Sequence, residues 1–454
     1  MPLPERRGPS RSRLRIAFLS QPRDPIAAGP GQRGSVAIVL WALASRLARH
    51  HEVLVLAPRR RGEPAEEATA QGPRIARLAP PLARLHRLLE AADGLVPRAL
   101  PHMARPLYFA GYPCRLAGPL ARFRPDIVHL MTVAQLLPGL ARALPDTPLV
   151  LHLHDELLLR LERRAAAARL APAAAVVTVS DWLAERLSAR FPEYRRKIVA
   201  IGNGVDLEGF APGRRGGPSE TGERLLFVGR ISPEKGVHVL IEAFARLAPR
   251  RPRLVLELVG EPGLMPRPFL ELLDRTPALE AALAFYGRGP LERLRRTLLG
   301  GGRLYLETLL GRLPDALRRR VILTGPLPHR TLVERYRAAD LLAAPSVCNE
   351  PFCLPVAEAM ASGLPCVTSL CGAPPELIGA RDPDGVGEAG IAVPPGDAEA
   401  LARAIELLLR DPDRRRTMGV AARRRAERLL GWEAAAARLE TAYRSLVVGP
   451  DALG

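Results

Sequence analysis

The sequence predicts an α/β protein built from two doubly wound parallel sheets. Its 454 residues suit two domains of roughly 150 to 250 residues each. In both halves of the chain, short apolar runs alternate with amphipathic helical runs, which is the pattern of strand–helix–strand units. The stretch LEGFAPGRRGGPSETGER, residues 207–224, is rich in Gly, Pro and polar residues, as linkers are. We therefore place the domain boundary near residue 206.

The first predicted domain comprises residues 1–205. Its expected strands are RIAFLS, EVLVLAP, DIVHLM, PLVLHLHD, AAVVTVS and KIVAIGNG, and VAIVLWALASRLARH is its first helix. Residues 74–123, rich in Arg, Leu and Pro, interrupt this alternation. Several short basic amphipathic helices are expected there, either at a membrane interface or packed on the sheet as ordinary surface helices.

The second predicted domain comprises residues 206–431. Its expected strands are RLLFVGR, RLVLELVG, RVILTGP, ADLLAAPS, LPCVTS and GIAVPP. A helical insertion at 290–320 interrupts them. Residues 432–454 contain a long predicted helix whose position the sequence leaves open, and packing back on the first domain is one option.

Composition narrows the class of protein. Hydrophobic residues at 47% and charged residues at 25% exclude global disorder. No apolar run reaches the roughly 18 to 20 residues that span a bilayer, and the apolar run near the start is too short for a signal peptide. The five cysteines lack CxxC spacing, so we expect reduced thiols in the cytoplasm, with peripheral attachment to the inner face of the membrane as an option.

The net charge of +19 is unevenly distributed. Residues 1–205 hold 31 Lys and Arg against 16 Asp and Glu, a net +15, and the rest holds 35 against 31, a net +4. Such an excess favours an anionic membrane, glycan or phospholipid as partner, although a general arginine bias explains it equally well. No basic segment with interleaved aromatic residues indicates nucleic-acid binding.

A predicted turn carries one of only two lysines in the chain. In LLFVGRISPEKGVHVLIEAF, residues 225–244, the turn joins a strand to a helix, with Pro233 near the helix start. Arg230 and Lys235 would project at the carboxyl edge of the sheet, beside the positive end of the helix. This arrangement predicts a phosphate site.

A pair of glutamates follows a later strand. In SVCNEPFCLPVAEAMASGLPCVTS, Glu350 and Glu358 are separated by seven residues. A helix beginning between them would place both carboxylates at one cleft. The backbone N–H groups of Phe352, Cys353 and Leu354 would then form a site for an anion or a hydroxyl. By itself such a pair can equally be exposed to solvent.

Together these segments resemble family 4 of the retaining glycosyltransferases, which have two facing Rossmann-like domains with a cleft between them, the GT-B fold. The segments GRISPEKG, EPFCLPVAEAMASGLPCV, YRAADLLAAPS and NGVDLEGFAP occur in the family's order and cover the second domain. In the first domain the resemblance rests on AGPGQRGS, HLHDE and VTVSDWL. It implies an acceptor-binding first domain and a donor-binding second domain.

The resemblance also implies roles for individual residues. Arg230 and Lys235 would neutralise the diphosphate of a nucleotide-sugar, Glu350 would hold the sugar, and Glu358 would accept hydrogen bonds from the ribose. With His154, which would approach the sugar from the first domain, Glu350, Arg230 and Lys235 form the expected catalytic set.

Further donor contacts are implied as well. The amides of Phe352, Cys353 and Leu354 would contact the sugar and diphosphate, and Gly34 and Ser35 would close over the phosphates. The family often has Gly where this chain has Cys353, and two adjacent glycines where it has Gly34-Ser35. Both departures bear on the identity of the donor.

The expected function is hexosyl transfer from a UDP-, GDP- or ADP-sugar to a glycan, lipid-linked or small-molecule acceptor, as in cell-envelope polysaccharide synthesis. Fixed cations and helix amino ends would stabilise the leaving diphosphate. Without an Asp-x-Asp site, no divalent metal and no cofactor are expected. The alternative is a catalytically silent GT-B protein with a structural or surface-coat role.

Other interpretations stay open for several of these residues. His154 can be a structural histidine at the sheet edge, or a metal ligand together with His152 and Asp155. The four cysteines between 348 and 371 are a weaker metal candidate, because their spacing is not that of zinc ligands. Ser180 and Asp181 are expected to cap a helix.

Overall fold

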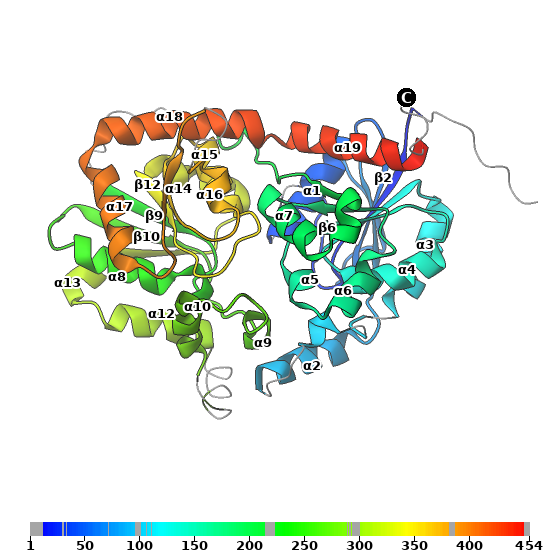
Figure 1. Cartoon of the computed structure of the whole chain (residues 1–454), viewed down its shortest axis with the longest axis horizontal. Helices are drawn as coiled ribbons and strands as arrows, with labels where there is room; N and C mark the ends of the chain where they lie inside the picture. Colours follow the sequence, from blue (N-terminus) through cyan, green and yellow to red (C-terminus); the bar gives the residue numbers. More distant parts are fainter. Residues whose placement is uncertain are drawn as a thin grey trace, which may run out of the picture.

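Two mainly parallel sheets, each flanked by helices, lie side by side in the computed structural model of the chain (Figure 1). The structure describes residues 12–29, 31–32, 34–70, 72–95, 101–105, 107–109, 111–213, 223–287, 289, 292, 300–380 and 386–448. The predicted fold class, two doubly wound α/β domains, is confirmed. Parts of the predicted linker (214–222) and of the predicted helical insertion lie outside the described residues.

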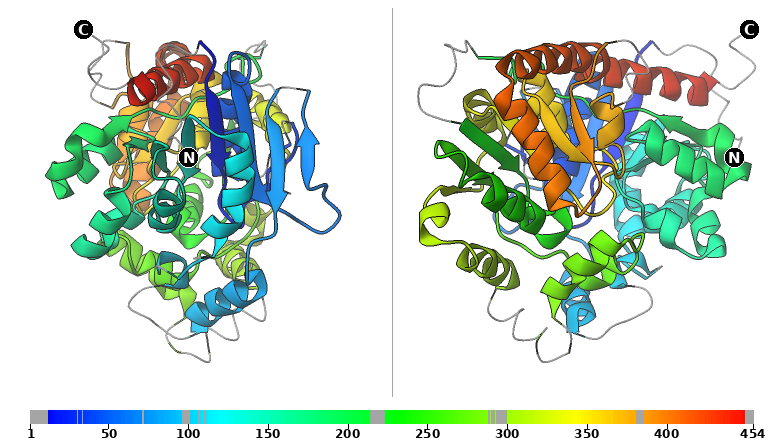
Figure 2. Two further views of the ribbon diagram at one scale, coloured as in Figure 1. Left: turned by 90° about the vertical axis from the view of Figure 1, so that its right-hand side faces the viewer. Right: turned by 60° about the vertical axis from the view of Figure 1, so that its left-hand side comes forward.

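The first sheet has eight strands in the order β3-β4-β2-β1-β5-β6-β7-β8. Neighbouring strands are parallel except β3, which pairs antiparallel with β4 (Figure 2). Their bounds are β1 Arg15–Leu19, β2 Glu52–Pro58, β3 Glu66–Ala68, β4 Arg74–Leu78, β5 Ile127–Met131, β6 Leu149–Leu153, β7 Ala175–Thr178 and β8 Ile198–Ala200. The central strands β5, β6 and β7 are buried at every position because helices cover both faces.

The second sheet has six parallel strands in the order β11-β10-β9-β12-β13-β14. Their bounds are β9 Glu223–Val228, β10 Leu254–Val259, β11 Val321–Gly325, β12 Leu341–Ala344, β13 Cys366–Ser369 and β14 Gly390–Val393. All six coincide with predicted apolar runs, although β11, at the edge of the sheet, has no buried position.

The helices connect successive strands. In the first domain they are α1 Ser35–Leu47, α2 Ala83–Leu95, α3 Tyr112–Phe123, α4 Leu137–Ala143, α5 Leu157–Arg160, α6 Arg163–Leu170 and α7 Asp181–Arg190. In the second they are α8 Val237–Leu247, α9 Arg267–Leu270, α10 Pro277–Leu283, α12 Gly301–Gly311, α13 Asp315–Arg318, α14 Leu332–Ala338, α15 Leu354–Ala361, α16 Pro374–Leu377, α17 Ala398–Arg410 and α18 Pro412–Leu429. The chain continues into α19 Trp432–Val448.

One local prediction was wrong. Residues 74–78, assigned to the basic helical stretch, form β4, because Ile75 and Ala76 are buried where the strand pairs with β2. Pro233 lies in the predicted turn before α8, where it begins a 3-10 turn. Gly236, with φ of 70°, ends that turn, and α8 begins after it.

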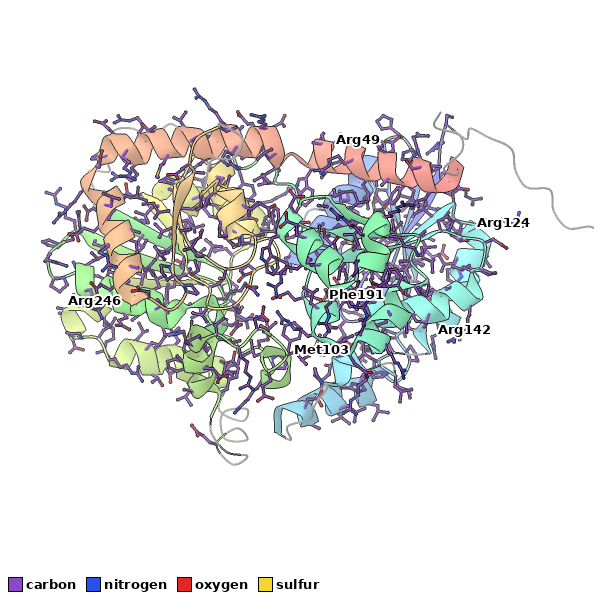
Figure 3. All side chains as sticks on the ribbon, viewed as in Figure 1. Arg49, Met103, Arg124, Arg142, Phe191 and Arg246 are labelled. Atoms are coloured by element: carbon purple, nitrogen blue, oxygen red, sulfur yellow. The ribbon has the colours of Figure 1, made fainter. Side chains whose placement is uncertain are left out.

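The last helices cross from one domain to the other. In Figure 1, α18 lies along the second domain and α19 along the first. The α19 helix packs against α1, and Glu433 of α19 accepts a hydrogen bond from Arg46 Nε at 2.6 Å. Arg49, labelled beside α19 in Figure 3, lies 3.2 Å from the same carboxylate. The carboxy-terminal helix therefore packs on α1, whereas the division of the chain into domains, with a boundary near residue 206, stays a prediction.

Candidate functional site

A pocket of about 160 Å³ lies between the two domains, at the carboxyl ends of their strands. The first domain contributes Ser35, His154, Val179 and Asn203 to its lining. The second contributes Lys235, Ser346, Glu350 and residues 351–355, among others. His154 follows β6 and Lys235 follows β9, so the pocket occupies the position where open α/β sheets bind ligands.

Lys235 and Glu350 form an ion pair inside this pocket. The Lys235 Nζ lies 2.5 Å from Glu350 Oε1, and Ser346 Oγ donates to the same oxygen at 2.6 Å. Burial acts to lower the pKa of Lys235, but the charge of Glu350 outweighs it and raises that pKa above its usual value. The lysine is therefore a fixed cation over the whole physiological pH range.

The loop after Glu350 leads into α15 with an unusual backbone conformation. Cys353 precedes the helix with φ of 86° and ψ of 79°, in the left-handed region that favours glycine. Phe352, Cys353 and Leu354 all line the pocket, so the amino end of α15 borders it. Burial raises the pKa of the Cys353 thiol to about 12, which keeps it protonated and poorly nucleophilic.

A second helix amino end reaches the pocket from the first domain. Ser35, the first residue of α1, lines it, and Gly34 precedes the helix with φ of 91°. The first turn of α1 carries no acidic residue that would cancel its positive end. Gly34 itself is exposed and does not belong to the lining.

Arg230 pairs with a different carboxylate from that of Lys235. Its guanidinium bonds to Glu234 Oε1, with an Nη2–Oε1 distance of 2.8 Å. Glu234 is buried and also accepts hydrogen bonds from Ser232 Oγ at 2.7 Å and Tyr286 OH at 2.8 Å. The structure thus places Arg230 in its own network outside the pocket lining.

Glu358 also lies outside the pocket lining. Its Oε1 is 2.7 Å from His329 Nε2, and its Oε2 accepts from Tyr336 OH at 2.7 Å. Burial acts to lower the pKa of His329, but the hydrogen bond to Glu358 raises it. His329 borders a second interdomain cavity of about 800 Å³, which Trp41 and Phe210 also line.

His154 faces the pocket without a charge. Burial lowers its pKa to about 3, and its Nε2 is buried without a hydrogen-bond partner. Asp155 is absent from the pocket lining, and its Oδ1 accepts a hydrogen bond from Leu157 N, at the start of α5, at 2.9 Å. Within the described ranges, no group of three or more His, Cys, Asp or Glu is arranged to hold a metal ion. All five cysteines are free thiols.

Polar contacts join the two domains beside the pocket. Asp274 of the second domain pairs with Arg160 and, at 2.9 Å, with Arg186 of the first. Asn349, next to Glu350, donates to Asp274 Oδ2 at 3.2 Å. At the start of α7, the Glu376 carboxylate accepts from the amides of Asp181 and Trp182, and Ser180 Oγ accepts from Leu183 N. Ser180 therefore caps α7 as predicted, whereas Asp181 is its first residue.

Comparison with known proteins identifies the family. The model named Glycosyl transferases group 1 matches residues 214–300 and 312–425, and the model named Glycosyltransferase Family 4 matches residues 36–208. The D-inositol 3-phosphate glycosyltransferase of Kineococcus radiotolerans is 30% identical over 479 residues, covering 96% of this chain and 97% of the relative. The chain belongs to the family 4 (group 1) glycosyltransferases.

Two further proteins resemble this glycosyltransferase over nearly its whole length. The spore coat protein SA of Bacillus subtilis is 24% identical over 445 residues, covering 95% of this chain and 99% of the relative. The crystal structure of HepE from Anabaena in complex with UDP-glucose has a TM-score of 0.61 and 19% identity, covering 95% of this chain and 100% of HepE. The last likeness shows a shared fold.

Several residues around the site of this glycosyltransferase were missed from the sequence. Ser346 holds Glu350, Glu234 holds Arg230, and Tyr336 holds Glu358. Asn203, whose buried Oδ1 lacks a partner, lines the pocket. All four lay in recognised motifs, Glu234 in GRISPEKG, Tyr336 and Ser346 in YRAADLLAAPS and Asn203 in NGVDLEGFAP, but nothing in those motifs indicated a role for their side chains.

Proposed function

We propose that this glycosyltransferase transfers a hexose from a nucleotide-diphosphate sugar bound in the pocket between its domains. The observation that carries the proposal is the Lys235–Glu350 pair, 2.5 Å apart, in a pocket that His154 also lines. A cation, a carboxylate and a neutral imidazole on one small cavity match the three parts of the reaction: diphosphate, sugar and reacting centre.

The chemistry follows from where charge develops. Cleavage of the sugar–phosphate bond leaves negative charge on the diphosphate, which Lys235 and the amino ends of α1 and α15 can stabilise. Glu350 orients the sugar through its hydroxyls, and His154 approaches from the other domain. Arg230 would join the diphosphate contact by leaving Glu234. Because protein groups supply the positive charge, the proposal requires no divalent metal.

The proposal extends to configuration, donor and acceptor. We infer retention of the anomeric configuration through same-face attack assisted by the donor phosphate. Glu358 would accept hydrogen bonds from the ribose hydroxyls after its present contact with His329 or Tyr336 is broken. UDP-, GDP- and ADP-sugars remain the candidate donors, and the UDP-glucose named for HepE supports UDP. The acceptor would be a glycan, a lipid-linked saccharide or a small molecule, and the inositol phosphate named for the Kineococcus relative supports the last.

Peripheral binding to an anionic membrane belongs to the same proposal. Near the start of α2, Leu82, Leu85 and Leu88 are exposed at helical spacing, and Arg84 is exposed among them. An exposed apolar and basic helix face suits an anionic lipid surface. In the residues that the structure describes, no helix is long and apolar enough to cross a membrane.

The membrane proposal is tested by sedimentation with vesicles. Wild-type protein should bind vesicles containing phosphatidylserine more than neutral vesicles, and the Leu85→Gln/Leu88→Gln variant should bind less than wild type. Equal sedimentation with both vesicle types would contradict membrane binding and would leave a general arginine bias as the explanation for the net positive charge of residues 1–205.

The enzymatic proposal is tested by nucleotide release. Purified protein is incubated with UDP-, GDP- and ADP-sugars and candidate acceptors, with and without EDTA. Lys235→Ala should abolish release, whereas Lys197→Ala, a change of the only other lysine, should retain it because Lys197 lies away from the pocket. Absence of donor binding by the wild type would favour a silent coat protein, the role that the name of the Bacillus relative suggests.

A further inference from the structure

A hydrogen-bonded chain of buried side chains runs from α19 to the pocket. Tyr443 OH lies 2.7 Å from His129 Nδ1, and His129 Nε2 lies 3.1 Å from His152 Nδ1. The ring of His152 lies against that of His154, with centroids 4.3 Å apart. Tyr443, His129 and His152 are at most 1% exposed, so the three side chains are shielded from bulk solvent.

Burial determines which group donates and which accepts in each of these hydrogen bonds. A buried hydroxyl donates wherever an acceptor is available, and His129 Nδ1 is the only acceptor that contacts the Tyr443 hydroxyl among the described residues. His129 then carries its hydrogen on Nε2 and donates it to His152 Nδ1. His152 in turn carries its hydrogen on Nε2, a buried nitrogen for which the structure shows no hydrogen-bond partner. One phenol thereby sets the tautomers of two imidazoles.

All three histidines are neutral in this arrangement. Burial lowers the pKa of His129 to about 3 and that of His152 well below its usual value. If His152 were protonated, its charge would oppose protonation of His154 and disturb the packing of the two rings. A neutral His152 with a fixed tautomer instead keeps one constant ring surface against which His154 packs. His154 is the member of this group that lines the pocket.

We propose that Tyr443, His129 and His152 are positioning residues that hold the imidazole of His154 in its working orientation. The inference rests on the proposed function, in which His154 lies beside the transferred sugar. It assigns a role in turnover to α19, a helix that follows the whole donor domain in the chain and contributes no residue to the described pocket lining. Lys235 and Glu350, which bind the donor, lie outside the chain of hydrogen bonds.

The kinetic test removes one oxygen atom. Tyr443→Phe keeps the ring but deprives His129 Nδ1 of its donor, and we expect kcat to fall about tenfold while the donor KM changes less than about twofold. Tyr194→Phe, on the surface of the first domain, is the matched control and should leave both constants unchanged. In a His154→Asn background, Tyr443→Phe should have no further effect on kcat. An equal loss in both backgrounds, or a change confined to KM, would overturn the proposal.

A spectroscopic test is independent of activity. In protein with ¹⁵N-labelled histidine, the imidazole NMR signals of His129 and His152 should show the Nε2–H tautomer, and Tyr443→Phe should change the signals of both rings. An Nδ1–H tautomer for either ring in the wild type would overturn the proposal without any variant. If the wild type showed these tautomers but transferred no sugar, the proposed function would fail while the hydrogen-bonded chain stood.

Discussion

The two sides of the pocket hold their polar groups in different ways. On the second-domain side, Lys235 pairs with Glu350, and Arg230 pairs with Glu234 close by. On the first-domain side, His154 is neutral and its Nε2 lacks a partner, as does the buried Oδ1 of Asn203. One side offers compensated charges, and the other offers neutral polar atoms.

This difference teaches how binding and reaction are divided between the domains. Compensated charges keep their ionisation and can exchange partners with a charged diphosphate. Neutral, unpartnered atoms suit the uncharged hydroxyls of a sugar or acceptor, since they lose no ion pair on binding. Changes on the second-domain side should therefore affect donor binding, and changes on the first-domain side should affect turnover.

The largest effect is expected from Glu350→Gln. The change leaves the Lys235 ammonium without its carboxylate and removes the charged acceptor for sugar hydroxyls, so kcat/KM should fall about 1000-fold. Nucleotide release measures it. The control is Glu399→Gln, which breaks an exposed pair with Arg403 and should be silent. If the variant kept a tenth of the wild-type activity, the proposed role of the Lys235–Glu350 pair at the reacting centre would be wrong.

The next largest effect is expected from His154→Asn. Because the proposed donor contacts come mainly from the second domain, turnover should fall about 100-fold while calorimetric affinity for the nucleotide-sugar stays within about twofold. The exposed His50→Asn should behave as wild type. Donor affinity that falls as far as turnover would contradict the division between the domains.

The buried imidazoles also predict how stability depends on pH. The pKa values of His129 and His154 are lowered to about 3, so below about pH 6.5 the unfolded chain binds protons that the folded chain does not. Stability is full above that pH and is lost as pH falls, by about 1.4 kcal/mol per pH unit for each such histidine.

Urea unfolding between pH 7 and pH 4 measures this dependence. The slope for His154→Asn should be shallower than wild type by about 1.4 kcal/mol per pH unit, and that for His50→Asn should be unchanged. Identical slopes in all three proteins would mean that His154 is protonated in the folded state.

A smaller effect is expected from Glu376→Gln at the junction of the domains. Its carboxylate accepts from Asp181 and Trp182 at the amino end of α7, and loss of the charge should weaken this contact by about 0.5 to 1 kcal/mol. The donor KM should rise about two- to fivefold and the radius of gyration from X-ray scattering should increase slightly. Glu185→Gln, exposed on α7, is the control. An unchanged KM would show that this contact does not help to hold the two domains together around the donor.

An effect of similar size is expected at Cys353. Its φ of 86° strains any residue with a Cβ, so Cys353→Gly should be more stable than Cys353→Ala by about 1 kcal/mol. Thermal unfolding measures the difference. The Gly variant should also accept bulkier donor sugars, because it opens the second-domain wall of the pocket. Equal stability of the two variants would mean that the loop relaxes.

Sequence reasoning identified the strands well and the side-chain partners poorly. Lys235 and Glu350 were both assigned to the donor site through the family resemblance, and they lie together because each follows a strand of the same sheet and parallel strands bring such positions to one edge. The strand β4 was missed because Arg74–Leu78 is too short for its alternation to stand out from the Arg- and Leu-rich helices after it.

The partners could not be predicted, for physical reasons. The pairing of Arg230 with Glu234 depends on the 3-10 turn at Pro233–Lys235, and the predicted turn carried no information about that backbone geometry. Contacts such as Glu358 with Tyr336 depend on how separate elements pack, and local periodicity contains no information about that. The contact between Tyr443 and His129 becomes visible only in the three-dimensional structure.

The separation of Tyr443 and His129 in the sequence affects how the protein folds during synthesis. The two residues are 314 positions apart in the chain. At about 5 to 20 residues per second, the ribosome adds Tyr443 about 15 to 60 s after His129. During that interval the nascent first domain carries a buried imidazole without its donor and an α1 surface without α19. Its maturation must wait until the donor domain has been synthesised, and a chaperone that shields this surface would act during that wait.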